Sequence, residues 1–384
     1  MGSDGTSGNP RAYLDHASSS PLRPAAREAM LPFLTGYPGD PARLHAEGRA
    51  TRIAVETARE QVAALFGARP REVVFTSSGT ESVNHAIWGG VRRGGIGGHI
   101  VTTAVEHSAV LDACRREPGE LTLVGVDTTG RIDPDEVAAA VTDATVLASV
   151  QLANHEVGTI QPLAEVVEQV RARHTDLLIH VDACAAAGRI PVDFGALGVD
   201  LLSVSGHKWG APKGAAALLV RRGLRVPPLI LGGAQERARR GGIEDVPAIV
   251  GFGAAAAEVS ETMPAESAAA RQRTERMAKE ILATVPGTVR YGADERLPHL
   301  LCMGVEGVEA EPVLLGLDQQ GVAVHSGSSC SSEALEPSPV LSAMGADADR
   351  SLRISVGWST TDADVDRLLT VLPEVVARLR ALRP

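Results

Sequence analysis

Short apolar runs alternate along most of the chain with segments of helical periodicity. Four to eight consecutive apolar residues bounded by turn residues are typical of strands that are buried on both faces. The predicted strands are residues 72–76, 99–104, 146–152, 177–181, 201–204 and 215–220. The predicted helices are residues 23–34, about 53–66, 81–88 and 163–173. This alternation indicates an α/β fold with a mostly parallel sheet and helices on both of its faces.

The pattern changes after about residue 260, where long helices rich in Ala, Glu and Arg are expected. The elements predicted beyond them are a strand at 300–305, a helix at 311–320, a strand at 322–324 and a helix at 362–380. Fewer strands and longer helices than in the first part indicate a second, smaller α/β domain.

The predicted domain organisation has four parts. Residues 31–260 are expected to form the larger domain, which binds the ligand, and residues 261–384 the smaller C-terminal domain. Residues 11–30 are expected to pack with the smaller domain. Residues 1–10 are rich in Gly and Ser, and we expect them to be disordered or a tag-like remnant.

Composition excludes several classes of protein. The 384 residues carry a net charge of −10 without a long basic run, so direct nucleic-acid binding is not expected. The four cysteines are widely spaced and form no CxxC pair, which argues against a disulfide framework or a zinc site. No apolar stretch reaches membrane-spanning length, and the N-terminus has no apolar signal region. We therefore expect a cytoplasmic protein without a membrane segment.

Polar residues follow five of the predicted strands. They are Ser78-Gly79-Thr80, His107, Asn154, Asp182 and the group Ser205, His207 and Lys208. In open α/β sheets, ligands bind beyond the carboxyl ends of the strands. The small residues around Gly79 also open a helix, whose first N–H groups suit an anion. The sequence therefore predicts a ligand site at this edge of the sheet.

Lys208 is the strongest candidate for an amine nucleophile. The chain has only three lysines. Lys279 belongs to a charged segment typical of a solvated helix face, and Lys213 lies in a Pro-Lys-Gly turn. Lys208 instead follows a buried apolar strand and lies directly after His207. A lysine in such a place can form a Schiff base with a carbonyl cofactor.

Together these residues match what pyridoxal phosphate needs. Lys208 supplies an amine, and Asp182 can pair with the protonated ring nitrogen. His107 can stack on the ring and move protons. The residues expected to hold the phosphate are Gly79, Thr80, Ser205 and His207. Each residue alone has an ordinary structural explanation, but the combination predicts a pyridoxal phosphate site.

Several blocks of the chain resemble the cysteine desulfurases, which belong to the aminotransferase-like enzymes of fold-type I. The blocks are residues 13–17, 75–82, 106–107, 153–162, 180–183, 205–208 and 232–236. The deciding block is 326–332, Ser-Gly-Ser-Ser-Cys-Ser-Ser, which is similar to the mobile-loop motif that carries the persulfide cysteine. The resemblance covers nearly the whole chain.

The resemblance implies a homodimer that converts L-cysteine to L-alanine and passes the sulfur to an acceptor protein. It implies that Cys330, on a loop at about 322–338, carries the persulfide, and that Lys208 and His107 act in catalysis. It further implies that Arg353 holds the substrate carboxylate and that Asn154 contacts both cofactor and substrate. Iron–sulfur assembly, nucleic-acid thiolation, DNA phosphorothioation and thio-natural-product pathways all fit as destinations of the sulfur.

Three positions depart from the family pattern. Ala185 stands where the family usually has a glutamine that reaches the cofactor hydroxyl. Ile243 stands where a threonine usually reaches the phosphate of the other subunit's cofactor. Asp245 replaces a usual asparagine. The resemblance therefore leaves two cofactor contacts without their usual side chains.

Two other readings of the sequence stay open. One is a selenocysteine lyase, an aminotransferase or another lyase of the same fold, although Cys330 in its Ser-rich loop argues against most of these. The other is a low-activity relative that serves as a scaffold for a sulfur-accepting partner.

Overall fold

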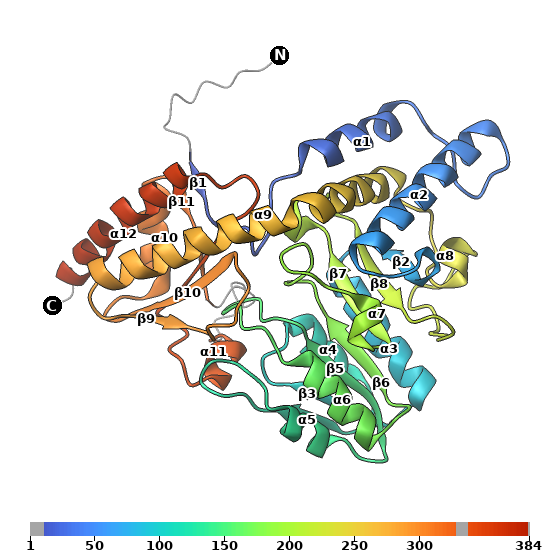
Figure 1. Ribbon diagram of the computed structural model, residues 1–384, viewed down its shortest axis with the longest axis horizontal. Coiled ribbons are helices and arrows are strands. Elements are labelled where there is room, and N and C mark those ends of the chain that lie inside the picture. Colours follow the sequence, from blue (N-terminus) through green and yellow to red (C-terminus); the bar gives the residue numbers. More distant parts are fainter. Residues whose placement is uncertain (1–10, 328–336, 383–384) are drawn as a thin grey trace.

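The computed structural model describes residues 11–327 and 337–382 (Figure 1). Within them, seven strands form the larger sheet, in the order β2-β8-β7-β6-β5-β3-β4. Their bounds are β2 Val73–Thr76, β3 His99–Thr103, β4 Leu121–Val124, β5 Thr145–Gln151, β6 Leu178–Asp182, β7 Leu201–Ser205 and β8 Ala216–Val220. Strand β8 is antiparallel to β2 and β7, and the other pairs are parallel. The predicted mostly parallel sheet is confirmed, with β4 as a strand that the apolar pattern did not predict.

Helices cover both faces of this sheet. One face packs against α3 (Gly79–Gly94) and α4 (Ser108–Arg116), which share a buried cluster with the strands. The helices that share the main buried cluster are α2 Ala46–Leu65, α5 Pro134–Ala140, α6 Leu163–Arg173 and α7 Phe194–Leu197. The central strands β5, β6 and β7 are almost wholly buried, as two-sided coverage requires.

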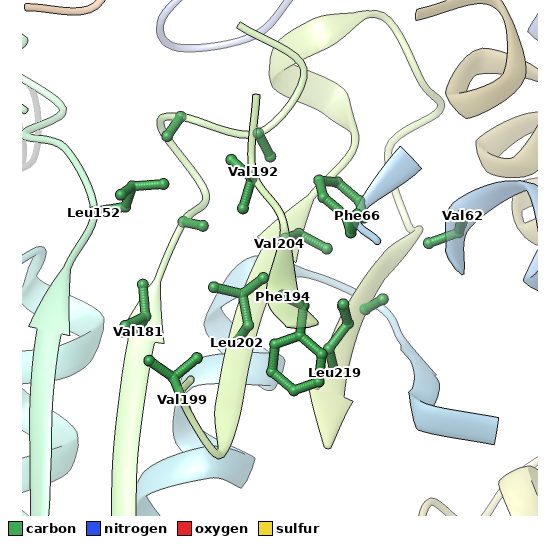
Figure 2. Packing of buried hydrophobic residues seen from close by; sticks show 14 of the residues in the cluster. Val62, Phe66, Leu152, Val181, Val192, Phe194, Val199, Leu202, Val204 and Leu219 are labelled. Atoms are coloured by element: carbon green, nitrogen blue, oxygen red, sulfur yellow. The ribbon is translucent and has the colours of Figure 1, made fainter. Parts of the chain in front are cut away.

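Aliphatic side chains build most of the main core, and a few aromatic rings fill its larger spaces. Figure 2 shows Phe66 and Phe194 among the side chains of the strands, including Leu202 and Leu219. Both rings are at most 4% exposed. This packing holds β6, β7 and β8 in place, and thereby fixes the strand ends at which the polar residues lie.

A second core lies over a smaller sheet. Its antiparallel strands are, in order, β12 His325–Ser326, β13 Ser351–Ser355, β10 Leu300–Val305 and β9 Thr288–Tyr291. A parallel pair, β1 Ala12–Tyr13 and β11 Val322–Ala323, lies in the same buried cluster. The nearby helices are α10 Ala310–Gln319, α11 Pro339–Ala343 and α12 Asp362–Ala381. The predicted C-terminal α/β elements are therefore present.

The 39-residue helix α9, Val246–Thr284, connects the two cores. Its first half packs against α1 (Pro24–Thr35) and α2, and its second half packs against α12 and the smaller sheet (Figure 1). The helix runs without a break through residue 260, where the sequence pattern suggested a boundary. Its buried residues continue on both sides of that point, so the change in composition marks a change of packing partner and not the end of an element.

The remaining elements are short. They are η1 Pro70–Glu72, η2 His207–Trp209 and α8 Gln235–Ala238. Inside α8, Glu236 and Arg237 have positive φ, and the buried Glu236 carboxylate accepts hydrogen bonds from both Arg59 Nη atoms at 2.7 Å. In the described part of the chain, no helix combines the length and apolarity needed to cross a membrane.

Candidate active site

A cavity lies beyond the carboxyl ends of β5, β6 and β7, which are direct neighbours in the sheet. It is lined by Ser78, Gly79, Thr80, Val83, His107, Ala109, Gln151, Ala153, His155, Asp182, Cys184, Ala185, Ser205, His207 and Lys208. Seven of the predicted site residues are among these. They are Gly79, Thr80, His107, Asp182, Ser205, His207 and Lys208. The sheet therefore brings together side chains from five separate segments of the chain.

Lys208 lies on the short η2 turn directly after β7. A Cβ atom at Gly206 would come within 2.6 Å of the Phe252 ring, so this tight entry into the turn requires glycine. The backbone carbonyl of Lys208 accepts hydrogen bonds from Ser20 Oγ, at 2.7 Å, and from the Arg189 guanidinium. The main chain is thus fixed independently of the side chain of Lys208, a residue that lines the cavity.

Asp182 ends β6 at the floor of the cavity and is 8% exposed. Burial alone would raise the pKa of this carboxyl. Hydrogen bonds from the backbone N–H and thiol of Cys184, with the nearby rings of His107 and His180, hold the pKa of Asp182 below its usual value. Asp182 is therefore an anion at neutral pH, as pairing with a protonated ring nitrogen requires.

The start of α3 and the β7 loop form a cradle for an anion. Ser78 caps α3 by accepting a hydrogen bond from the backbone of Glu81. A Cβ at Gly79 would lie 2.7 Å from Cys184 Sγ, so only glycine lets the helix start approach the cavity floor this closely. His207 Nε2 is buried and has no hydrogen-bond partner among the described residues. Burial and the charges of Lys208 and Lys213 lower the pKa of His207 to about 4.

His107 is the N-cap residue of α4. Its Nδ1 accepts a hydrogen bond from the backbone N–H of Ala109 at 3.0 Å, so in the neutral ring the proton is on Nε2. The ring meets that of His155 edge to face, with 5.0 Å between the ring centroids. These two contacts fix the plane of His107 at the wall of the cavity, where a flat ligand can stack against it.

The residues of the cavity are chemically suited to pyridoxal phosphate. The phosphate would satisfy the buried His207 nitrogen and the free N–H groups at the start of α3. Asp182 would meet the ring nitrogen, His107 would lie against the ring, and Lys208 would reach the aldehyde. Each part of the cofactor therefore has a chemically suitable neighbour.

Two predicted residues lie outside the cavity lining. Asn154 is fully buried: its Nδ2 donates to the carbonyl of Val105, and its Oδ1 accepts from the backbone N–H groups of Glu156 and Val157. These hydrogen bonds show that the Asn154 side chain stabilises the turn in which it lies. The neighbouring His155 lines the cavity in its place. Neither helical nor strand periodicity predicts which of these two adjacent side chains faces the cavity, because the direction of each depends on the conformation of the turn.

Arg353, on β13, is 2% exposed. One Nη atom lies 3.0 Å from the Asp15 carboxylate, and the other donates to the carbonyl of His155 at 3.2 Å. The guanidinium therefore lies behind His155, next to the cavity and not in its lining. Its pairing with Asp15 joins residues that are 338 positions apart in the chain.

The remaining predicted positions are scattered. Cys330 lies outside the described residues. Ala185 lines the cavity, whereas Ile243 is 67% exposed and lines a separate depression beside α9. Asp245 caps α9 by accepting a hydrogen bond from the backbone N–H of Ala248 at 3.1 Å. The three departures from the family pattern thus have three different structural settings.

Glu106, which precedes His107 in the chain, is buried outside the cavity lining and has no proposed role in the chemistry. Its Oε1 accepts hydrogen bonds from Thr103 and from the backbone of Gln151, while Oε2 has no such partner among the described residues. Burial raises the pKa of Glu106 to about 8, and the nearby charge of Asp182 adds to the rise. At neutral pH this carboxyl is mostly protonated.

Glu106→Gln should make the stability of the protein less dependent on pH. Because the pKa of Glu106 is raised in the folded protein, folding favours the protonated carboxyl. The contribution of this group to the free energy of unfolding is therefore fully present below the ordinary pKa of a glutamate and is lost as the pH rises toward 8. The free energy of unfolding of the parent should therefore fall between pH 5 and 8 by up to about 1.4 kcal/mol per pH unit from this group. Glutamine does not titrate, so urea unfolding of the variant should lack this slope. Glu60→Gln, at an exposed position, should behave like the parent; equal slopes in the parent and Glu106→Gln would contradict the prediction.

The comparisons with known proteins agree with this geometry. The aminotransferase class-V family profile matches residues 12–368. A cysteine desulfurase of Nostoc sp. is 42% identical over 381 residues, covering 97% of this chain and 94% of the relative. A solved NifS-like protein superposes with a TM-score of 0.90 at 30% identity, covering 96% of this chain and all of that one. The structure titled "SspA in complex with cysteine" has a TM-score of 0.79 at 31% identity, covering 90% of this chain and 98% of that one.

These likenesses confirm the fold and the pyridoxal phosphate cofactor that the sequence predicted. They extend over nearly the whole chain, so both the larger and the smaller sheet are included. The chain therefore belongs to the class-V aminotransferase family, as one of its pyridoxal-phosphate-dependent cysteine desulfurases.

Proposed function

We propose that the protein takes sulfur from L-cysteine, carries it as a persulfide on Cys330 and releases L-alanine. The observation that carries the proposal is the meeting of Lys208, Asp182 and His207 in one cavity, where each matches a different part of pyridoxal phosphate. When bound, this cofactor supplies an aldehyde that bonds to amines and a pyridinium ring that draws electrons from the adjacent substrate carbon. Side chains of the protein supply the other groups that the reaction needs.

Lys208 is the proposed catalytic amine. When the cofactor is bound, Lys208 Nζ would hold it at its aldehyde. Lys208 Nζ would also take the proton from the substrate Cα, since Lys208 lines the cavity and its backbone is anchored by Ser20 and Arg189. Asp182, an anion that accepts hydrogen bonds from Cys184, would keep the ring nitrogen of the bound cofactor protonated. His107 holds the ring plane, since its Nδ1 is committed to the α4 cap.

The proposed sulfur carrier is Cys330, on the basis of its Ser-Gly-Ser-Ser-Cys motif. Its thiolate attacks the sulfur of the substrate, so that an S–S bond forms and the Cβ–S bond breaks with its electron pair left on carbon. Alanine is complete once that carbon gains a proton and the proton taken from Cα is returned to it. The three other thiols are poor alternatives, because burial raises the pKa of each: Cys114 and Cys302 are buried in packed cores, and Cys184, in the cavity lining, also lies next to the negative charge of Asp182.

Arg353 is the proposed anchor of the substrate carboxylate. A guanidinium suits this task, since it binds carboxylates through parallel N–H groups. Its position next to the cavity supports the assignment, and Asp15 and the carbonyl of His155 hold its orientation. A substrate carboxylate bound to this guanidinium would share it with the carboxylate of Asp15.

We also propose that the enzyme works as a homodimer that hands its sulfur to an acceptor protein. Large apolar side chains that are exposed on the single chain support a subunit interface; among them are Leu231, 80% exposed, and Ile243. Within each subunit we propose a larger cofactor-binding part and a smaller part that carries the Cys330 loop. The two buried cores joined by α9 support this division.

The test is release of alanine and sulfide from L-cysteine by the purified protein with bound pyridoxal phosphate and a thiol reductant. We expect the two products in equal amounts and in many turnovers per subunit. L-selenocysteine and amino-group acceptors serve as competing substrates. A protein that binds the cofactor but forms no alanine would favour the scaffold, and preferential use of selenocysteine would favour the lyase.

A further inference from the structure

Glu156 is a buried acid that none of the proposed steps uses. It is 1% exposed and lies in the turn after β5, next to His155 in the chain. Its backbone N–H donates to Asn154 Oδ1 at 2.8 Å, so the main chain of the turn is held without the Glu156 side chain. The carboxylate oxygen Oε2 accepts a hydrogen bond from the hydroxyl of Ser338. This bond joins two residues that are 182 positions apart in the chain.

Ser338 is fully buried and lies at the start of α11. As the N-cap residue, its Oγ accepts a hydrogen bond from the backbone N–H of Leu341 at 3.1 Å. The same hydroxyl donates its proton to Glu156. A single side chain therefore caps α11 and also attaches the helix to the turn beside the cavity.

Apolar side chains pack α11 against the same part of the larger sheet. Val105, which follows β3, and Val157, in the turn after β5, belong to one buried cluster. Val340 and Leu341 of α11 belong to it as well. A hydrogen bond in such surroundings is stronger than one in water, because the local dielectric constant is low and water cannot compete for it. The start of α11 is therefore fixed relative to the cavity turn.

The stretch of chain that carries Cys330 is also fixed on its other side. Gly327 donates its backbone N–H to the carbonyl of Ser351 at 3.1 Å, directly after β12 pairs with β13. A Cβ atom at Gly327 would lie 2.3 Å from Ser351 Oγ, so this close approach requires glycine. Cys330 comes three positions after Gly327 and eight before Ser338. Contacts of the described residues thus hold the chain on both sides of Cys330.

Two fixed ends favour the encounter that sulfur transfer needs. The thiolate of Cys330 has to meet the substrate sulfur in the cavity from a defined direction. A reacting group on a segment with both ends held has fewer arrangements to lose in that encounter than one on a segment held at one end. The residues that line the cavity include neither Glu156 nor Ser338, so cofactor binding does not use this contact directly.

We propose that the hydrogen bond between Ser338 and Glu156 is a positioning contact for sulfur transfer. It holds the chain that carries Cys330 against the turn at the cavity, so that the thiolate reaches the sulfur of the substrate. The inference rests on the proposed function of Cys330 and adds two residues to it. Glu156 and Ser338 act through the placement of Cys330 and are positioning residues.

Glu156→Ala removes the acceptor and leaves the Ser338 cap of α11 in place. We expect persulfide formation on Cys330, measured in a single turnover with L-cysteine, to slow about 10- to 100-fold, the cost of a misplaced reacting group. Exchange of the Cα proton of L-alanine with D₂O should stay within about twofold of the parental rate, because this proton transfer needs Lys208 and the cofactor but not Cys330. A merely structural role of Glu156 would lower both rates together.

Matched variants of both partners test the contact itself. Glu156→Gln keeps an oxygen that can accept from Ser338, so both rates should be parental. Ser338→Gly removes the donor, and α11 should persist because glycine is also tolerated as a helix N-cap. We expect Ser338→Gly to slow persulfide formation as much as Glu156→Ala does. A parental rate in Ser338→Gly, or a loss in Glu156→Gln equal to that in Glu156→Ala, would overturn the inference.

The double variant Glu156→Ala/Ser338→Gly should form persulfide no more slowly than either single variant, because one contact can be lost only once. Effects that multiply would contradict the proposal. The parent is first tested for alanine release and for persulfide on Cys330, and failure there overturns the proposed function. In a working enzyme, parental persulfide formation in the single variants, or a parallel loss of proton exchange, overturns the inference alone.

Discussion

Replacing Lys208 with alanine is expected to abolish the covalent attachment of pyridoxal phosphate and to lower desulfurase activity by at least about 10²–10⁴-fold, the contribution of a positioned proton-transfer group. The amine has two tasks, attachment and proton removal, and the other two lysines cannot assume them. Lys213 lies outside the cavity lining, and Lys279 is on the distal half of α9. The cavity itself should persist, because the main chain at Lys208 is held through its carbonyl.

The measurement is reduction of the loaded protein with borohydride, followed by mass spectrometry of its peptides. The parent should carry the reduced cofactor on the peptide that contains Lys208, and Lys208→Ala should carry none. Lys213→Ala and Lys279→Ala are the matched controls and should behave like the parent. A variant that remains yellow and is still reduced at another lysine would overturn the assignment of Lys208.

Replacing Cys330 with serine should leave cofactor binding intact and abolish persulfide formation and sulfur transfer. The serine hydroxyl is a far weaker nucleophile toward sulfur than a thiolate, whereas the groups proposed to hold the cofactor lie on the larger sheet. We expect the absorbance of the bound cofactor to be unchanged and the transfer of labelled sulfur to fall to background.

The control for Cys330→Ser is Cys114→Ala. Cys114 is 1% exposed in the cluster between α3 and α4, and burial raises the pKa of its thiol to about 12. Its replacement should lower stability but not sulfur transfer. Alkylation of trapped persulfides, followed by peptide mapping, should find the extra sulfur on Cys330 alone. Persulfide on another cysteine in the Cys330→Ser protein would identify a different carrier.

The elements were predictable because their signals are local. Apolar runs predicted β5, β6 and β7 to within one residue at either end, because a short, continuous apolar run between turn residues is the sequence pattern of a strand buried on both faces. Helix α3 was predicted too short: the pattern began at Glu81, whereas the helix starts at Gly79 and continues to Gly94. Small residues at both of its ends give a weak periodic signal, although here they pack closely against neighbouring segments.

Residues of the candidate site were predictable where a reactive or charged side chain comes directly after a strand. Lys208, Asp182 and His107 each come within a few residues of a strand end, and parallel neighbours in a sheet bring such ends together. The prediction placed Asn154 in the site, whereas His155 lines the cavity. That difference is a matter of which way two adjacent side chains point in an irregular turn, where neither a period of two nor one of 3.6 applies.

The sequence by itself determined the α/β class, the order of the elements, the lysine that can serve as the amine and the cysteine motif that accompanies it. The tertiary structure decided which side chains share the cavity wall, that Asp15 pairs with Arg353, and that α9 serves both cores. The reason is the range of the interactions. Periodicity and turn residues act within about ten positions of the chain, whereas the Asp15–Arg353 pair and the facing of His155 depend on contacts between segments that only the folded sheets bring together.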